Sequence, residues 1–107
     1  ATFETKKSKF IAHICPYNQF DNILIRLKKE HTKARHFVYA YQYINEVEQI
    51  IQNSSDDKEP KGTSGRPCLK ILSSAGVVNS AVIVVRYFGG IKLGIGGLVR
   101  AYSNAVN

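Results

Sequence analysis

The residues best suited to chemistry lie in one stretch, Ala81 to Tyr102, which reads AVIVVRYFGGIKLGIGGLVRAY. Glycine lets the backbone take positive φ or approach another group closely, and five glycines fall within nine residues here: Gly89, Gly90, Gly94, Gly96 and Gly97. The same stretch carries three cations, Arg86, Lys92 and Arg100. Free backbone N–H groups and fixed positive charges together indicate a site that binds anions.

Two predicted elements position these residues. The apolar, β-branched run from Ala81 to Val85 predicts a strand that is buried on both faces. From Leu98 the apolar spacing becomes that of one helix face, which predicts a helix from Leu98 to the last residue, Asn107. The unit is therefore strand, glycine loop and helix N-terminus, and the positive end of the helix dipole lies beside the cations.

The formal charge of +7 is unevenly distributed. Residues 1–60 carry nine Lys and Arg against eight Asp and Glu, whereas residues 61–107 carry six Lys and Arg and no acid. An acid-free basic half predicts a positive face and a partner such as RNA, phosphate or an acidic protein surface. The alternative is a basic surface that only confers solubility. The predicted anion-binding or nucleic-acid-binding residues are Arg66, Arg86, Lys92, Arg100, Gly89, Gly90, Gly94, Gly96 and Gly97.

The remaining elements follow from apolar periodicity and breakers. We expect strands at Ser8–Tyr17 and His36–Ile44, a short strand around Val47–Ile51, an amphipathic helix through Phe20–Leu27, a mobile polar loop at Gln52–Gly62, and a helix from Ser64, its N-cap, to Gly76. The expected fold is α+β, a two-layer sandwich with a mixed sheet of about four strands and two or three helices on one face. With 107 residues the chain has room for one domain and one core.

Two further clusters have alternative interpretations. Phe37, Tyr39, Tyr41 and Tyr43 share one face of a strand, where they either stack RNA bases or pack under helices; no RNP-type motif is present, so we favour packing. The acids Asp56, Asp57 and Glu59 lack the spacing of a calcium loop. We expect them to be solvated or to pair with arginines, and one alternative ties their loop to Arg86 or Arg100 through charge-assisted hydrogen bonds.

Signatures of catalysis are weak. A P-loop needs Lys and Ser or Thr after its glycines, but Gly94 is followed by Ile95. The hydroxyls of Thr63 and Ser64 do not form a nucleophile elbow, and His31 and His36 are not at a zinc spacing. We therefore expect a binding module rather than an enzyme, with no catalytic residues, no metal and no cofactor.

The compartment is predicted from what the chain lacks. Cys15 and Cys68 form no CxxC pair, which suits a reducing environment. There is no signal-peptide core and no apolar run near the ~18 residues of a membrane span. We expect a cytoplasmic protein with no membrane partner.

Two long motifs resemble those of a known family. Residues 56–67, DDKEPKGTSGRP, are similar to the signature DDGEPxGTAGxP, and residues 86–102 are similar to RYFGGxKLGxGGLxRAY. These are signatures of the IMPACT family, called YigZ in bacteria, and Ser8–Ala12, His31 and His36–Tyr41 also fit its N-terminal half. The chain departs from the signature at Lys58, where glycine is usual, and at Ser64, where alanine is usual. The family-motif loop comprises Asp56, Asp57, Glu59, Pro60, Gly62 and Thr63.

The resemblance implies a fold like the second domain of small-subunit ribosomal protein five. It also implies a ferredoxin-like C-terminal domain that residues 1–107 do not include, and a link to translation. Eukaryotic members bind the ribosome-associated activator of the kinase that phosphorylates initiation factor two, and so restrain the response to amino-acid starvation. For bacterial members nucleic-acid binding has been suggested, and this chain most resembles that type.

These observations together predict a non-enzymatic regulatory module of translation under stress. Its partner would be RNA, the ribosome or a ribosome-associated protein, bound through the basic glycine-loop surface. The alternative is a domain or enzyme that holds a small phosphorylated ligand at Gly89–Leu98.

Overall fold

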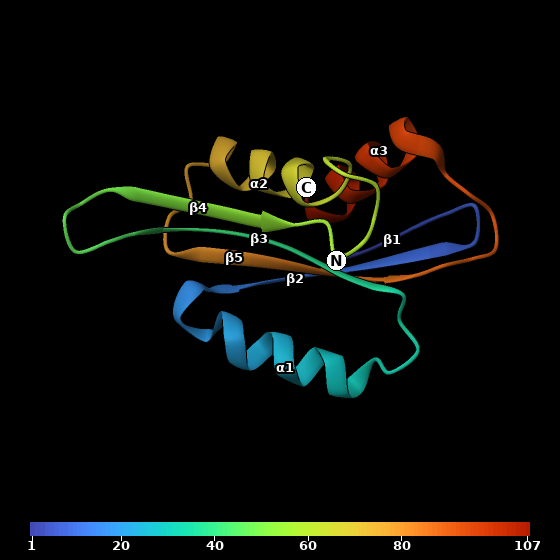
Figure 1. Ribbon diagram of the computed structural model, residues 1–107, viewed down its shortest axis with the longest axis horizontal. Coiled ribbons are helices and arrows are strands. Elements are labelled where there is room, and N and C mark those ends of the chain that lie inside the picture. The colour runs from blue at the N-terminus through green and yellow to red at the C-terminus, as the bar shows by residue number, and fades with distance from the viewer.

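The computed structural model describes all of residues 1–107. Five strands and three α-helices follow one another along the chain (Figure 1). They are β1 (Thr2–Thr5), β2 (Ser8–Pro16), a 3₁₀ turn (Tyr17–Gln19), α1 (Phe20–Glu30), β3 (His36–Ile44), β4 (Ile50–Ser55), α2 (Gly65–Ser74), β5 (Ser80–Tyr87) and α3 (Gly94–Val106).

The strands form one sheet in the order β1-β2-β5-β3-β4, and every neighbouring pair is antiparallel. The last strand in the chain, β5, is therefore the central one. It pairs with β2 on one side and β3 on the other, with Phe10 and His36 both opposite Arg86.

Helices cover both faces of the sheet (Figure 1). On one face, α1 packs Phe20 and Leu27 against Ala81, Ile83 and Val85 of β5. On the other face, α2 lies over β3 and β4 while α3 lies over β1 and β2. Side chains alternate along a strand, so Val82 and Val84 of β5 belong to this second core. Burial of each such side chain stabilises the fold by roughly 1.5–3 kcal/mol.

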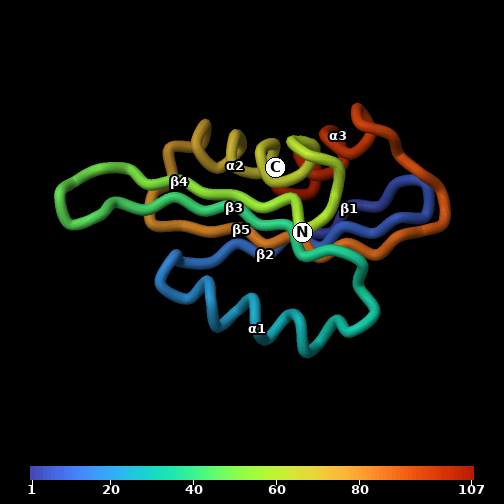
Figure 2. Tube along the Cα trace, viewed as in Figure 1, coloured from blue at the N-terminus to red at the C-terminus, as the bar shows by residue number.

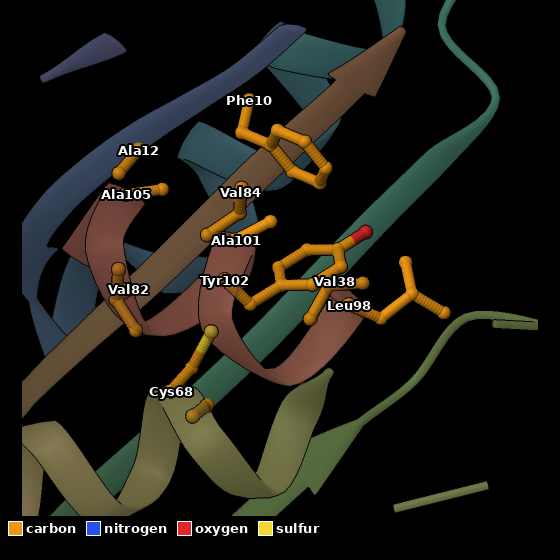
Figure 3. Packing of buried hydrophobic residues seen from close by; sticks show 11 residues of the cluster. Phe10, Ala12, Val38, Cys68, Val82, Val84, Leu98, Ala101, Tyr102 and Ala105 are labelled. Atoms are coloured by element: carbon orange, nitrogen blue, oxygen red, sulfur yellow. The ribbon is translucent and has the colours of Figure 1, made fainter. Parts of the chain in front are cut away.

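Tyr102 of α3 lies at the centre of the second core (Figure 3). Its ring meets Phe10 edge to face, with a centroid distance of 5.0 Å. Cys68 of α2 reaches the same core. Burial raises the pKa of the Cys68 thiol to about 12, so the thiol stays neutral inside the domain.

The predicted α+β class is confirmed, but three details of the prediction are wrong. The sheet has five strands because Thr2–Thr5 adds an edge strand to β2. It is antiparallel rather than mixed because β5 inserts between β2 and β3, so strands joined by a helical crossover never pair directly. The helices are not on one face, because a central strand that is apolar on both sides needs cover on both.

Three predicted boundaries also differ. The polar segment Gln52–Gly62 begins as strand, since β4 extends to Ser55. The last helix starts at Gly94, one turn before Leu98, because glycines do not prevent a helix whose next turns are buried. The predicted strand at the start of the chain ends at Pro16, and Tyr17 already belongs to the 3₁₀ turn. No helix here is both long enough and apolar enough to cross a membrane.

Candidate functional site

The N-terminus of α2 is already occupied by a carboxylate of the protein. The Oδ1 atom of Asp56 accepts hydrogen bonds from the backbone N–H groups of Ser64 (3.1 Å) and Gly65 (2.8 Å), and Oδ2 accepts one from Gly62 (2.8 Å). Ser64 is the N-cap residue, as predicted, but its side chain makes no capping bond. Asp56 therefore places a negative charge of the protein itself at the start of this helix, where it satisfies these donors and the helix dipole.

The next acid also binds backbone. Asp57 Oδ2 accepts a 2.7 Å hydrogen bond from the N–H of Phe37 on β3, and the Asp57 carbonyl accepts one from His36 Nδ1 at 2.7 Å. At the neighbouring Lys58, φ is +72°, a backbone conformation that glycine adopts most readily. The family-motif loop is thus held against the end of β3, and its first two acids are structural.

The third acid, Glu59, is buried and contacts three polar side chains. Glu59 Oε2 accepts from Arg86 Nη1 at 2.5 Å and from the Tyr102 hydroxyl at 2.6 Å, and His36 Nε2 lies 3.4 Å from Oε1. Burial and the bond to Glu59 both raise the pKa of the Tyr102 phenol, so it remains a donor. The expected tie between this loop and an arginine is present, with Arg86 as the partner.

Ser8 fixes the glycine loop to the β1–β2 turn. Its hydroxyl accepts from the N–H of Gly89 (3.1 Å) and from Arg86 Nη2 (3.4 Å). Figure 2 shows the segment after β5 running alongside the β1–β2 turn. A Cβ at Gly89 would lie 2.1 Å from the carbonyl carbon of Lys7, so only glycine permits this approach.

In contrast to the N-terminus of α2, that of α3 is open, which here means that no side chain of the protein caps it. Its N-cap residue, Leu93, makes no side-chain capping bond, and no acid lies in the first turn. A hollow of about 350 Å³ opens at this point. It is lined by Arg35, His36, Glu59, Pro60, Arg86, Phe88, Lys92, Leu93, Gly94, Ile95 and Leu98.

The structure gathers some of the predicted cations at this hollow and separates others. Lys92 is exposed at its rim, and Arg86 lines it but is buried and paired with Glu59. Arg100 lies in a second hollow, of about 160 Å³, together with Lys6. Arg66 is exposed on the first turn of α2 and lines neither hollow.

Of the predicted glycines, Gly94 lines the first hollow and Gly97 the second. Gly90 and Gly94 both have positive φ, +89° and +75°, and so shape the loop between β5 and α3. Gly96 is exposed in the first turn of α3, and the three atoms nearest to a Cβ there would all belong to the Arg100 side chain.

Sequence reasoning missed Arg35 and Phe88 as members of this site. The Arg35 guanidinium lies 5.0 Å from the centre of the Phe88 ring, and Arg86 lies 5.6 Å from it. Arg35 immediately precedes β3, and its N–H donates to the carbonyl of Arg86. Only the pairing of β3 with β5 brings Arg35 to the hollow, and no motif in the sequence encodes that register.

The aromatic face of β3 lies on the side of α1. Phe20 of α1 meets Tyr39 and Tyr41 at 4.9 and 5.1 Å, and Tyr17 stacks on Tyr43 at 4.2 Å. The tyrosine rings are half-buried and pack on one another and on the buried Phe20, which is the packing that the sequence favours. They lie on the opposite face from the hollow.

The hydroxyls weighed as nucleophiles are buried and locally bonded. Thr63 Oγ1 donates to the carbonyl of Pro60 at 2.5 Å and lies 3.1 Å from Ser64 Oγ. No cluster of three or more His, Cys, Asp or Glu side chains is arranged to hold a metal ion.

Comparison of the chain with known proteins identifies its family. The model of the Impact N-terminal domain matches residues 6–107. The chain is 41% identical over 105 residues to the IMPACT family member YvyE of Bacillus subtilis, covering 95% of this chain and 48% of YvyE. It is also 41% identical over 107 residues to YigZ of Escherichia coli, covering 97% of this chain and 52% of YigZ.

Two solved structures share the fold. One, a crystal structure of a hypothetical protein, matches with a TM-score of 0.91 and 38% identity over 99% of this chain and 53% of that one. The other, the two-domain translational regulator Yih1, matches with a TM-score of 0.61 and 25% identity over 97% of this chain and 45% of Yih1. The chain spans about half the length of these bacterial relatives. It belongs to the IMPACT family and contains that family's N-terminal domain.

Proposed function

We propose that this domain is a non-enzymatic regulatory module of translation that binds RNA at the open N-terminus of α3. The link to translation is supported by the likeness to Yih1, a translational regulator. The choice of RNA is supported by the charge of the surface. The family resemblance supports the further proposal of a role under stress, and the free cysteines suit the proposed cytoplasmic location.

The observation that carries the proposal is the difference between the two helix starts. Asp56 fills the N-terminus of α2, whereas α3 begins without a capping side chain or an acid beside an exposed Lys92. Free N–H groups at a helix start, with the positive end of the dipole, are the standard backbone means of holding phosphate. Arg35 adds a second exposed cation at the same hollow.

The second hollow extends the positive surface along α3. Arg100 and Lys6 line it, while Leu93 contributes to both hollows. Successive phosphates of one RNA strand would contact Lys92 and Arg35 first and Arg100 and Lys6 next. Arg66 lines neither hollow, so we assign it no phosphate contact.

Binding of a fluorescent single-stranded RNA, measured by anisotropy at 50 and 200 mM KCl, tests the proposal. With the four phosphate contacts named above, counterion release predicts that the affinity for a single strand falls by about 50-fold over this range. Lys92→Ala and Arg35→Ala should each weaken binding and reduce the salt slope by about one contact. Lys70→Ala is the matched control, because Lys70 is exposed on α2 and lines neither hollow.

Affinity that does not change with salt, or equal losses in Lys70→Ala and Lys92→Ala, would contradict RNA binding at this site. Absence of RNA binding together with salt-sensitive binding of an acidic protein would replace RNA by a protein partner. Both results leave the family assignment unaffected.

A further inference from the structure

We propose that the hollow at the start of α3 selects a phosphate monoester, the terminal phosphate of a nucleotide, over the phosphodiesters inside an RNA chain. This inference rests on the proposed function because it concerns the same site. It adds which phosphate is bound most tightly.

The charge of the lining residues supports a dianion. Three cations, Arg35, Arg86 and Lys92, line the hollow together with one acid, Glu59. The buried contact with Arg86 already balances the Glu59 charge. Arg35 and Lys92 remain, together with the positive end of α3. A monoester carries close to two negative charges at neutral pH, whereas a diester carries one.

A second observation comes from Arg86 itself. Its side chain lines the hollow and is 4% exposed, and its Nε–H has no hydrogen-bond partner. Its Nη atoms bond to Glu59 and Ser8. Buried donors are almost always satisfied, so the lone Nε–H marks a place where the protein supplies a donor and lacks the acceptor. A phosphate oxygen in the hollow would become that acceptor through a turn of the Arg86 side chain, which lines the hollow.

The form of the hollow limits what can enter. A volume of about 350 Å³ suits a nucleotide-sized group rather than a length of backbone. Exposed apolar side chains, Phe88 and Ile95, lie at the same hollow as the cations. The phosphate would face Lys92 and the α3 amides, and the sugar and base would lie against these apolar side chains.

Three RNA octamers of one sequence test this inference, bearing a 5′-phosphate, a 3′-phosphate or hydroxyls at both ends. We expect an end-phosphorylated octamer to bind at least tenfold more tightly than the hydroxyl form. Lys92→Ala and Arg35→Ala should abolish that preference, and Lys70→Ala should retain it. AMP and inorganic phosphate, added as competitors, should displace the end-phosphorylated octamer.

The outcomes separate the two proposals. Equal affinity for the three octamers overturns the monoester inference and leaves RNA binding standing. Saturable binding of AMP that requires Lys92, without binding of any octamer, supports the monoester site and contradicts RNA binding. Failure of all of these ligands to bind overturns both.

Discussion

Arg86 and Glu59, 27 positions apart in the chain, form an ion pair of 2.5 Å in which each side chain is at most 5% exposed. The pair joins the central strand to the family-motif loop, and Tyr102 of α3 donates to the same carboxylate. Both long motifs therefore meet at one buried carboxylate. The glycine loop and the acidic loop form a single structural unit beneath the candidate site.

Replacing Glu59 by Gln should lower the free energy of unfolding by about 3–5 kcal/mol, because Arg86 would remain buried without a counter-charge. Urea denaturation measures this change. Tyr102→Phe is the matched control, since it removes one hydrogen bond from the same carboxylate and should cost about 1–2 kcal/mol. A loss below about 1 kcal/mol for Glu59→Gln would show that the pair does not hold the loop.

Asp56→Asn should destabilise the domain by about 1.5–3 kcal/mol, since charged acceptors make the stronger hydrogen bonds and Asp56 receives three of them. The loss of negative charge at the start of α2 acts in the same direction. Thermal unfolding followed by circular dichroism measures it. Asp57→Asn should also lower the melting temperature, because the Asp57 carboxylate accepts a hydrogen bond from the N–H of Phe37. The decrease should be smaller than for Asp56→Asn, since this is a single hydrogen bond. Glu46→Gln is the control, because this carboxylate is exposed in the β3–β4 turn, and it should leave the melting temperature unchanged.

Gly96→Ala should stabilise the domain by about 0.5–1 kcal/mol, because alanine is the better helix former. The added Cβ would lie 3.2 Å from the flexible end of Arg100, which can move away. Gly97→Ala should not stabilise the domain. Its added Cβ would lie 3.0 Å from the Cβ of Leu93, and this close contact should cancel the gain in helix propensity. Chemical denaturation of both variants measures these changes in the free energy of unfolding. A destabilised Gly96→Ala would show that the first turn of α3 needs glycine for the fold itself.

Stability should fall as the pH drops through the histidine range. Burial lowers the pKa of His13 below its usual 6.5, with a further lowering by His31, the N-terminal amine and Arg26 that Glu30 partly opposes. The unfolded chain then binds the proton more tightly than the folded one, so the free energy of unfolding decreases as pH falls below about 6.5. Urea unfolding at pH 7.5, 6.5 and 5.5 should show a shallower decrease for His13→Gln. Parallel curves for the two proteins would exclude His13 as a source of the pH dependence.

Local sequence determined the types of the elements and the family. The β-branched run before Arg86 predicted the central strand, and apolar spacing predicted all three helices, because periodicity depends only on neighbours a few residues away. The two motifs also identified the IMPACT family. For the loop acids the sequence left two alternatives, solvation or pairing with arginines such as Arg86 or Arg100, and did not decide between them.

Only the tertiary structure decided which residues meet. Strand order and register place His36 opposite Arg86, which brings Arg35 to the hollow and gives the Glu59 carboxylate its partner. The same topology buries Arg86, moves Arg100 to a second hollow and leaves Lys92 at the open end of α3. Such pairings join segments tens of residues apart, and they depend on how every strand and helix packs over both faces of the sheet. Because local periodicity carries no information on that packing, the sequence predicted Arg86, Lys92 and Gly94 as site residues but not Arg35 or Phe88, nor which cations meet at one hollow.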